Sequence, residues 1–165
     1  MYSRILLAYD GTREGLVALR EGALLAKLCG AKIFLLSVLP EKQGLIAAEG
    51  VYSDVVGQQI DSYKALLTRG VTALKQLGFS PVSRLVIGEP APEIGAFAKE
   101  VCADLVVLGH RKQNLLQRWW SGGTGAYISE HVTCSVLIGR NVISDDDFEA
   151  ALRQAQKMDA PPAMP

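Results

Sequence analysis

The sequence predicts a doubly wound α/β fold, in which helices cover both faces of one parallel sheet. Five short runs are apolar along most of their length, which is typical of buried strands, and amphipathic segments with helical spacing lie between them. Strands that alternate with helices form parallel sheets with right-handed crossovers. The more polar third run suits a sheet edge, and the fully apolar fourth run suits a central position. The expected strands are residues 4–9, 31–40, 82–88, 104–110 and 134–140.

Capping and stop residues set the ends of the expected helices. Thr12 can cap the first helix, which Gly30 ends. A long helix begins at about Asp54 and ends at Gly78. A third helix covers residues 91–103, where a proline in the first turn is tolerated.

The remaining segments are less regular. Residues 41–50 hold two glycines without clean periodicity and predict a surface loop, whereas residues 125–132 fit a short helix. We expect residues 1–141 to form the α/β domain and residues 142–165 to form a C-terminal extension. That extension begins with one helix, packed on the body or on a partner subunit, and ends in disorder.

Composition and charge exclude several classes of protein. The 165 residues suit one domain, and 17 basic residues balance 17 acidic ones, so there is no basic excess of the kind that nucleic-acid-binding proteins show. The apolar segment at the N-terminus is short and is soon followed by charged residues, unlike a signal peptide. No apolar run approaches the roughly 20 residues of a membrane span. Cys29, Cys102 and Cys134 are expected to be free, buried thiols of a reducing compartment. We therefore expect a cytoplasmic protein that binds neither nucleic acid nor a membrane.

The fold class also predicts where a ligand binds. In doubly wound folds, ligands lie at the carboxyl ends of the strands, where the strand order reverses. The turn "YDGT" follows the first expected strand, and "GHRK" follows the fourth. If these two strands are neighbours, their loops face each other across one crevice.

The stretches "ILLAYDGT", "VIGEPAPEIGAFAKEVCADLVVLGHR" and "HVTCSVLIGR" resemble the universal stress protein family, and the match covers roughly residues 1–141. The resemblance is consistent with a five-stranded sheet in the order 3-2-1-4-5. It also implies a cytoplasmic stress-response protein that binds ATP or a related adenine nucleotide, with or without Mg²⁺. The last strand, residues 134–140, matches the strand through which many members form a homodimer.

Many members of that family bind ATP through a motif of the form G-x-x-G, nine residues, then G-[S/T]. In this sequence Gly109 matches the first glycine and Gly122 the third, at the family spacing. Lys112 stands where the second glycine is expected, and Gly123 and Gly125 stand at the two hydroxyl positions. The spacing is therefore kept, while the side-chain requirements are missed at these positions.

These departures differ in physical weight. The absence of a hydroxyl at Gly123 removes one hydrogen bond, worth roughly 0.5–1.5 kcal/mol, and the neighbouring Thr124 can replace it. A β-carbon at Lys112 costs about 1 kcal/mol or more if the position needs a positive φ. Lys112 and Arg111 also supply two cations that can bind phosphate. Whether Lys112 blocks the phosphate or binds it stays open at this point.

The resemblance assigns roles to residues of both loops. Adenine would lie near Val38 and Leu108, and Asp10 would approach the ribose, a metal or an adenine edge. The alternative for Asp10 is a turn residue that bonds its own loop. Phosphates would lie between the two cations and the N–H groups of the glycine cluster. The complete candidate set is Ala8, Tyr9, Asp10, Val38, Leu108, Gly109, Arg111, Lys112, Gly122, Gly123, Thr124 and Gly125.

Catalytic patterns are missing from the sequence. It shows no nucleophile with a base and an acid, no carboxylate pair and no Cys/His metal spacing. We therefore expect a binding protein and not an enzyme, although weak ATP hydrolysis, which needs only Mg²⁺ and a positioned water, stays open. The alternative function is a dimeric interaction protein of the same fold, whose degenerate motif does not bind nucleotide.

Overall fold

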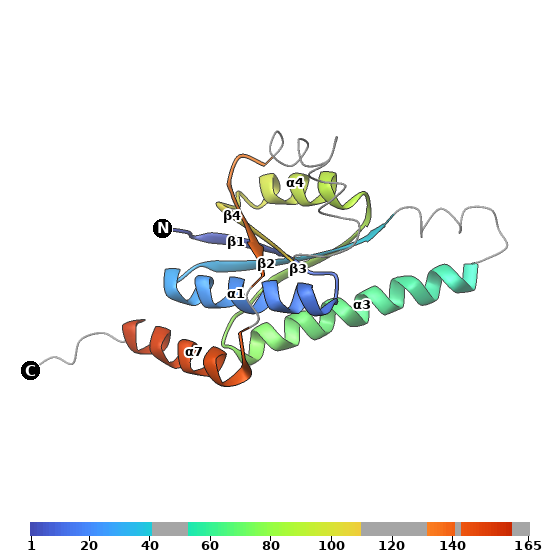
Figure 1. The fold of residues 1–165 in the computed structure, drawn as a ribbon. Coiled ribbons are helices and arrows are strands. Elements are labelled where there is room, and N and C mark those ends of the chain that lie inside the picture. Colours follow the sequence, from blue (N-terminus) through green and yellow to red (C-terminus); the bar gives the residue numbers. More distant parts are fainter. Residues whose placement is uncertain (41–52, 110–131, 141–142, 160–165) are drawn as a thin grey trace, which may run out of the picture.

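The computed structural model describes residues 1–40, 53–109, 132–140 and 143–159. Within these ranges, parallel strands and helices follow one another along the chain (Figure 1). The strands are β1 (Arg4–Ala8), β2 (Lys32–Pro40), β3 (Val82–Gly88), β4 (Leu105–Gly109) and β5 (Ser135–Gly139). The helices are α1 (Arg13–Cys29), α3 (Ser53–Gln76), α4 (Pro90–Glu100) and α7 (Asp145–Asp159).

The strands form one parallel sheet in the order β3-β2-β1-β4-β5, which confirms the expected fold class and strand order. β1 lies in the middle, and its residues Ile5, Leu6 and Leu7 are all buried. β3 lies at one edge and exposes several side chains, as its polar sequence predicts. Because β1 has β2 on one side and β4 on the other, the strand order reverses at β1.

Helices cover both faces of the sheet. On one face, α1 and α3 pack against strand residues such as Leu7 and Leu35. On the other face, α4 packs against Leu6 and Leu36. Figure 1 shows α1 and α3 below the sheet and α4 above it. Since successive side chains of a strand point to opposite faces, the continuous apolar runs fill both layers of the core.

Three of the described helices end with the same backbone motif, in which an N–H group donates to the carbonyl five residues earlier. The left-handed residue of the motif is Gly30 after α1, Gly78 after α3 and Cys102 after α4, with φ of 62°, 86° and 50°. The two glycine stops confirm the prediction from the sequence. Cys102 is a strained exception, because a side chain in this region costs roughly 1 kcal/mol or more.

The three cysteines are free thiols, as expected. Cys29 and Cys134 are partly buried, and burial raises the pKa of the Cys134 thiol. Cys102 is exposed, so the expectation of a buried thiol is wrong at this position. The apolar helix pattern continues to this residue in the sequence, but the chain has already turned out of α4, and such turns lie at the surface.

The C-terminal helix α7 packs against α1. Its residues Phe148, Leu152 and Ala155 are buried, and the Arg20 guanidinium of α1 lies 5.4 Å from the centre of the Phe148 ring. Ser144 caps the helix, since its Oγ accepts a hydrogen bond from the Asp147 N–H at 3.1 Å. The tail helix expected from the sequence is therefore part of the body of this chain.

Several expectations lie outside the described residues. These are the surface loop at 41–50, the short helix at 125–132 apart from its last residue, and the disorder of the chain end beyond Asp159. The division into a domain of residues 1–141 and an extension stays a prediction.

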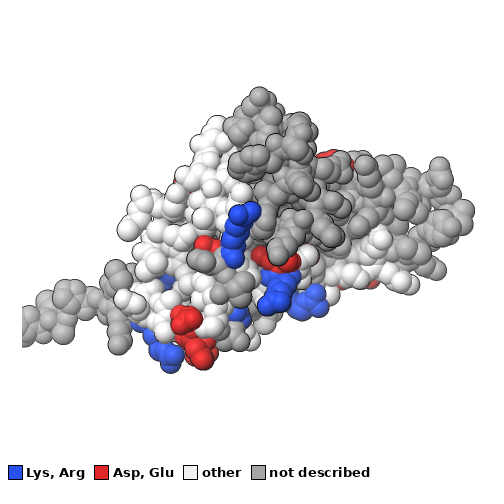
Figure 2. Space-filling view, viewed as in Figure 1, with Lys and Arg blue, Asp and Glu red and all other residues white. Residues whose placement is uncertain are grey.

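Acidic and basic side chains lie next to each other on the face drawn in Figure 2. A surface pair of this kind joins Arg84 of β3 to Glu100 of α4 through two hydrogen bonds of 2.6 and 2.5 Å. The hydrogen bonds to Arg84 lower the pKa of the Glu100 carboxyl. The described part of this face thus shows no large patch of one sign, in keeping with the balanced composition.

Candidate functional site

β1 and β4 end side by side, which is the arrangement that the crevice expected from the sequence requires. These strands are hydrogen-bonded neighbours, with Ala8 of β1 opposite Leu108 of β4. Ala8 also lies opposite Leu36 of β2. The condition set by the sequence is met, because the chain leaves β1 and β4 at the same edge of the sheet and at the point where strand order reverses.

Three of the candidates for the adenine side lie on one face of the sheet. Ala8, Val38 and Leu108 all pack with the apolar cluster beneath α4, where Leu108 is buried and the other two are half-buried. The Tyr9 ring belongs to the opposite cluster, with α1 and α3, and is 8% exposed. The structure therefore brings three candidates together and places the Tyr9 side chain on the other face, as the alternation of a strand requires.

Tyr9 tightens the end of β1 through its backbone. Its N–H donates to the Leu36 carbonyl at 2.8 Å, and its carbonyl accepts a hydrogen bond from Ser37 Oγ at 2.7 Å. Ser37 is fully buried, so this bond satisfies a hydroxyl that would otherwise be costly to bury. Burial raises the pKa of the Tyr9 phenol, against a smaller opposing effect of Arg69, so the ring stays neutral near pH 7.

Asp10 and Thr12 form a compact turn that opens α1. Asp10 Oδ1 accepts from the Thr12 N–H at 3.0 Å and from Thr12 Oγ1 at 2.6 Å. Thr12 Oγ1 in turn accepts from the Gly15 N–H at 3.0 Å, which is the helix cap expected from the sequence. Asp10 thus has the role of a turn residue, and this same turn holds a carboxylate in a defined place just beyond the end of β1.

Gly109 ends β4 directly against the backbone of α1. A Cβ at Gly109 would stand 2.8 Å from the Glu14 carbonyl oxygen and 2.9 Å from the Gly15 nitrogen. Its β5 neighbour Gly139 packs in the same way, since a Cβ there would stand 2.7 Å from Ala18 Cα. The resemblance assigns Gly109 to the nucleotide motif, which stays a prediction, whereas the structure shows that the close approach of strand and helix calls for glycine here.

Some of the predicted site residues lie outside the part of the chain that the structure describes. These are Arg111, Lys112 and the glycine cluster that ends the motif. Residues that the sequence did not single out are Ser37 of β2, which bonds Tyr9, and Leu66 of α3, which contacts the turn at Gly11. Ser37 could have been noticed as a lone hydroxyl inside an apolar run, whereas nothing in the local sequence indicates Leu66.

Other kinds of site are less well supported by the described residues. They hold no group of three or more His, Cys, Asp or Glu side chains that could bind a metal ion. In the same part of the chain, no helix is long and apolar enough to cross a membrane. A cavity of about 610 Å³ beside α4 is lined by Cys102 and Cys134 among mostly apolar residues, and by none of the predicted site residues.

Known proteins of similar sequence and fold give a consistent result. The model of the universal stress protein family matches residues 1–140. A relative from Staphylococcus haemolyticus, whose name places it in that family, is 26% identical over 151 residues, covering 90% of each chain.

Solved structures share the fold at low sequence identity. Hypothetical protein MJ0577 superposes with a TM-score of 0.70 at 23% identity, over 87% of this chain and 99% of that one. A universal stress protein in complex with cAMP gives 0.63 at 22% identity, over 84% and 97% of the two chains. One from Archaeoglobus fulgidus in complex with dAMP gives 0.61 at 24%, over 84% and 98%.

The family model covers the chain from its first residue to the end of β5, including the turn at Asp10 and the β4 end at Gly109. The sheet order agrees with the order that the resemblance led us to expect, and the solved structures share this fold. The chain therefore belongs to the universal stress protein family.

Proposed function

We propose that this protein binds ATP or another adenine nucleotide in the crevice between the loops after β1 and β4, and acts in the stress response as a binding protein and not as an enzyme. The observation that carries the proposal is the Asp10–Thr12 turn at the point where strand order reverses. The complexes of related structures with cAMP and dAMP support an adenine nucleotide in general.

The described residues suggest how the nucleotide would be oriented. Ala8, Val38 and Leu108 offer an apolar surface on one face of the sheet, which suits adenine. Asp10, fixed by Thr12, would then approach the ribose or the adenine edge. Such a preformed carboxylate costs little ordering entropy on binding, which favours affinity.

The phosphates are assigned to the second loop. We propose that they lie between Arg111, Lys112 and the N–H groups of Gly122, Gly123, Thr124 and Gly125. The described residues offer no cluster of metal ligands, so Mg²⁺ would enter bound to the phosphates, with Asp10 as the nearest carboxylate of the first loop.

Isothermal titration with Mg-ATP, ADP, AMP and cAMP tests this function directly. We expect saturable binding to the purified, nucleotide-free chain, and no binding at millimolar nucleotide would refute the proposal. Asp10→Asn serves as a focused variant, because the amide oxygen can still accept the two hydrogen bonds from Thr12. It should weaken binding while leaving thermal stability close to that of the wild type.

Two substitutions separate the roles of Lys112. If the position needs a positive φ, Lys112→Gly relieves strain and tightens binding, whereas Lys112→Ala does not. If the ammonium binds phosphate, both variants weaken binding, and added salt reduces the difference from the wild type. Equal affinity of all three chains would remove Lys112 from the site.

The second candidate function is a homodimeric interaction protein that does not bind nucleotide. The departures at Lys112, Gly123 and Gly125 favour it, and so does the exposed edge strand β5, where Val136 is 43% exposed. We propose that residues 134–140 form the dimer contact under either function. Light scattering at micromolar concentration tests this, with Val136→Lys as the disrupting variant, and a wild-type monomer would contradict it.

We also propose a cytoplasmic location, because three free thiols are typical of a reducing compartment. ATP hydrolysis is expected to be negligible. A single-turnover assay with excess protein checks this, and phosphate release above the buffer background would assign a slow hydrolase activity.

A further inference from the structure

The turn that carries Asp10 rests against the long helix α3. Gly11 has a φ of 73°, and a Cβ added to it would stand 2.2 Å from Leu66 Cδ1 and 2.6 Å from Leu66 Cγ. All three of the nearest atoms in that direction belong to the Leu66 side chain. The isobutyl group of Leu66 is therefore packed directly on the Gly11 backbone, next to Asp10.

A second contact lies one helical turn further along α3. Gly70 faces the Tyr9 ring, and a Cβ there would stand 3.0 Å from two ring carbons. Residues four apart lie on the same face of a helix, so this face of α3 contacts the chain on both sides of Asp10, at Tyr9 and at Gly11.

The other contacts that support the turn hold its two ends and not Gly11 itself. Ser37 of β2 holds the Tyr9 carbonyl, and the Thr12 cap holds the first turn of α1. Gly11 lies between these two anchors and is exposed apart from its contact with Leu66. Because glycine has the widest choice of backbone conformations, a glycine next to Asp10 makes this part of the turn the easiest to displace.

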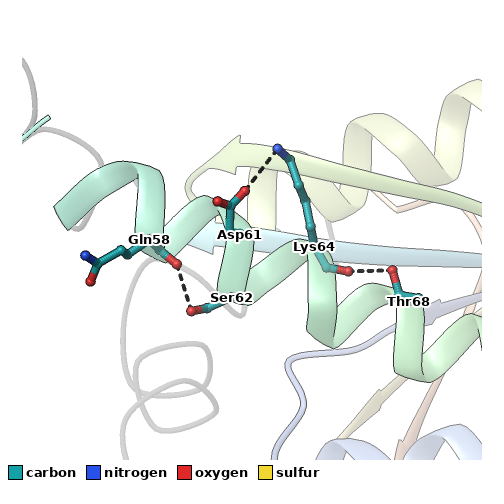
Figure 3. Close-up of polar contacts among 5 residues, drawn as sticks. All are labelled: Gln58, Asp61, Ser62, Lys64 and Thr68. Atoms are coloured by element: carbon teal, nitrogen blue, oxygen red, sulfur yellow. Dashed lines mark hydrogen bonds and ion pairs between the residues drawn. The ribbon is translucent and has the colours of Figure 1, made fainter. Parts of the chain in front are cut away.

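Several polar side chains on the exposed side of α3 bond within the helix itself. Figure 3 draws these contacts among five residues of the helix. Lys64 pairs with Asp61 at 3.3 Å, Ser62 Oγ donates to the Gln58 carbonyl at 2.8 Å, and Thr68 Oγ1 donates to the Lys64 carbonyl at 2.8 Å. Leu66, by contrast, belongs to the apolar side of α3 that packs against the core cluster of the sheet.

We propose that Leu66 is a positioning residue for nucleotide binding: by filling the space over Gly11, it holds the Asp10–Thr12 turn in the conformation that meets the ligand. The inference rests on the proposed function. It assigns to α3, which provides none of the predicted ligand contacts, control over the affinity of the site. Anything that shifts α3 along the sheet then changes how tightly the nucleotide is held.

The test compares Leu66→Ala with Leu67→Ala. Leu67 is the adjacent, partly buried residue of the same helix and the same cluster, and it is not among the atoms nearest to Gly11. Both variants lose similar packing, so general destabilisation affects them alike. Leu66→Met, which keeps the volume over Gly11, serves as the rescuing variant.

Two readouts are measured on each chain. Amide hydrogen exchange of Thr12 and Gly15 reports the turn without any ligand, because both N–H groups are bonded inside it. We expect Leu66→Ala to speed their exchange about fivefold or more relative to Leu67→Ala. Titration with Mg-ATP should show about a tenfold higher Kd for Leu66→Ala, and a near-wild-type Kd for Leu67→Ala and Leu66→Met.

The outcomes separate this inference from the proposed function. If the wild type binds no nucleotide but Leu66→Ala alone loosens the turn, the proposed function fails and Leu66 still positions Asp10. If the wild type binds and Leu66→Ala matches Leu67→Ala in exchange or in Kd, the positioning role is overturned. If Leu66→Ala does not fold, Leu66→Val takes its place in the test. Valine opens a smaller space over Gly11, so we expect smaller changes of the same sign in both the exchange rate and the Kd. If Leu66→Val leaves both readouts at the wild-type value, the role is overturned as well.

Discussion

Replacing Gly109 by alanine separates the packing role of this glycine from its role in a nucleotide motif. The added Cβ would lie 2.8 Å from the Glu14 carbonyl oxygen and 2.9 Å from the Glu14 carbon and the Gly15 nitrogen, whereas ordinary contacts begin near 3.4 Å. Those atoms belong to helix backbone and cannot rotate away. β4 and α1 must therefore separate by about half an ångström, and overpacking of this kind costs roughly 1–3 kcal/mol.

The assay is urea denaturation. The chain must be free of nucleotide, because a bound ligand would add stability by mass action. For a chain of this size, each kcal/mol lost lowers the melting temperature by about 2–4 °C. The matched control is Gly57→Ala, at a helical position of α3 where a Cβ meets nothing within 4 Å. This control should gain roughly 0.5–1 kcal/mol. If Gly109→Ala unfolds at the same urea concentration as the wild type, the close approach of β4 to α1 is not a constraint and the reasoning is wrong.

Three further predictions concern other parts of the fold. Cys102→Gly should raise the free energy of unfolding by about 1 kcal/mol, because it relieves the left-handed strain after α4; equal or lower stability in urea would contradict this. Tyr9→Phe should flatten the alkaline loss of stability: burial raises the pKa of Tyr9, so above about pH 10 the unfolded wild type loses its phenolic proton first and is favoured. Denaturation at pH 9 and pH 10.5 checks this, and parallel curves for both chains would argue against it. Phe148→Ala should lower stability by about 3 kcal/mol, since the ring is buried between α7 and α1; a loss below about 1 kcal/mol would mean that α7 is only loosely attached.

The sequence predicted the fold well, because each signal was local and physical. Apolar runs specified buried strands, and the alternation of strands with helices specified a parallel sheet. The Thr12 cap and the left-handed glycines Gly30 and Gly78 are found where the sequence placed them. Cys102 was misjudged because it performs the same backbone task as those glycines with a different residue type.

The candidate site was predictable only in part. Ala8, Val38 and Leu108 could be grouped because parallel strands end at one edge and side chains alternate. The contact of Leu66 with Gly11 joins residues far apart in the chain, and no local pattern reports which leucine of an amphipathic helix faces which turn. The separation of Tyr9 from its neighbours follows from the same alternation once the register of β1 is known.

Gly109 also limits what a glycine motif can say about function. Its Cα approaches the α1 backbone so closely that glycine is needed there whether or not a phosphate binds. A chain of this fold that had lost its nucleotide would keep this glycine for packing, so its presence does not separate the two candidate functions. Titration of the wild-type chain separates them, and Lys112 then separates a blocking role from a binding role, because a required positive φ and the ammonium charge would predict opposite changes in affinity. A nucleotide-binding member is therefore distinguished from a purely interacting one by whether the wild-type chain binds nucleotide, and the Asp10→Asn variant and the comparison of lysine, glycine and alanine at position 112 then test the two loops of the proposed site.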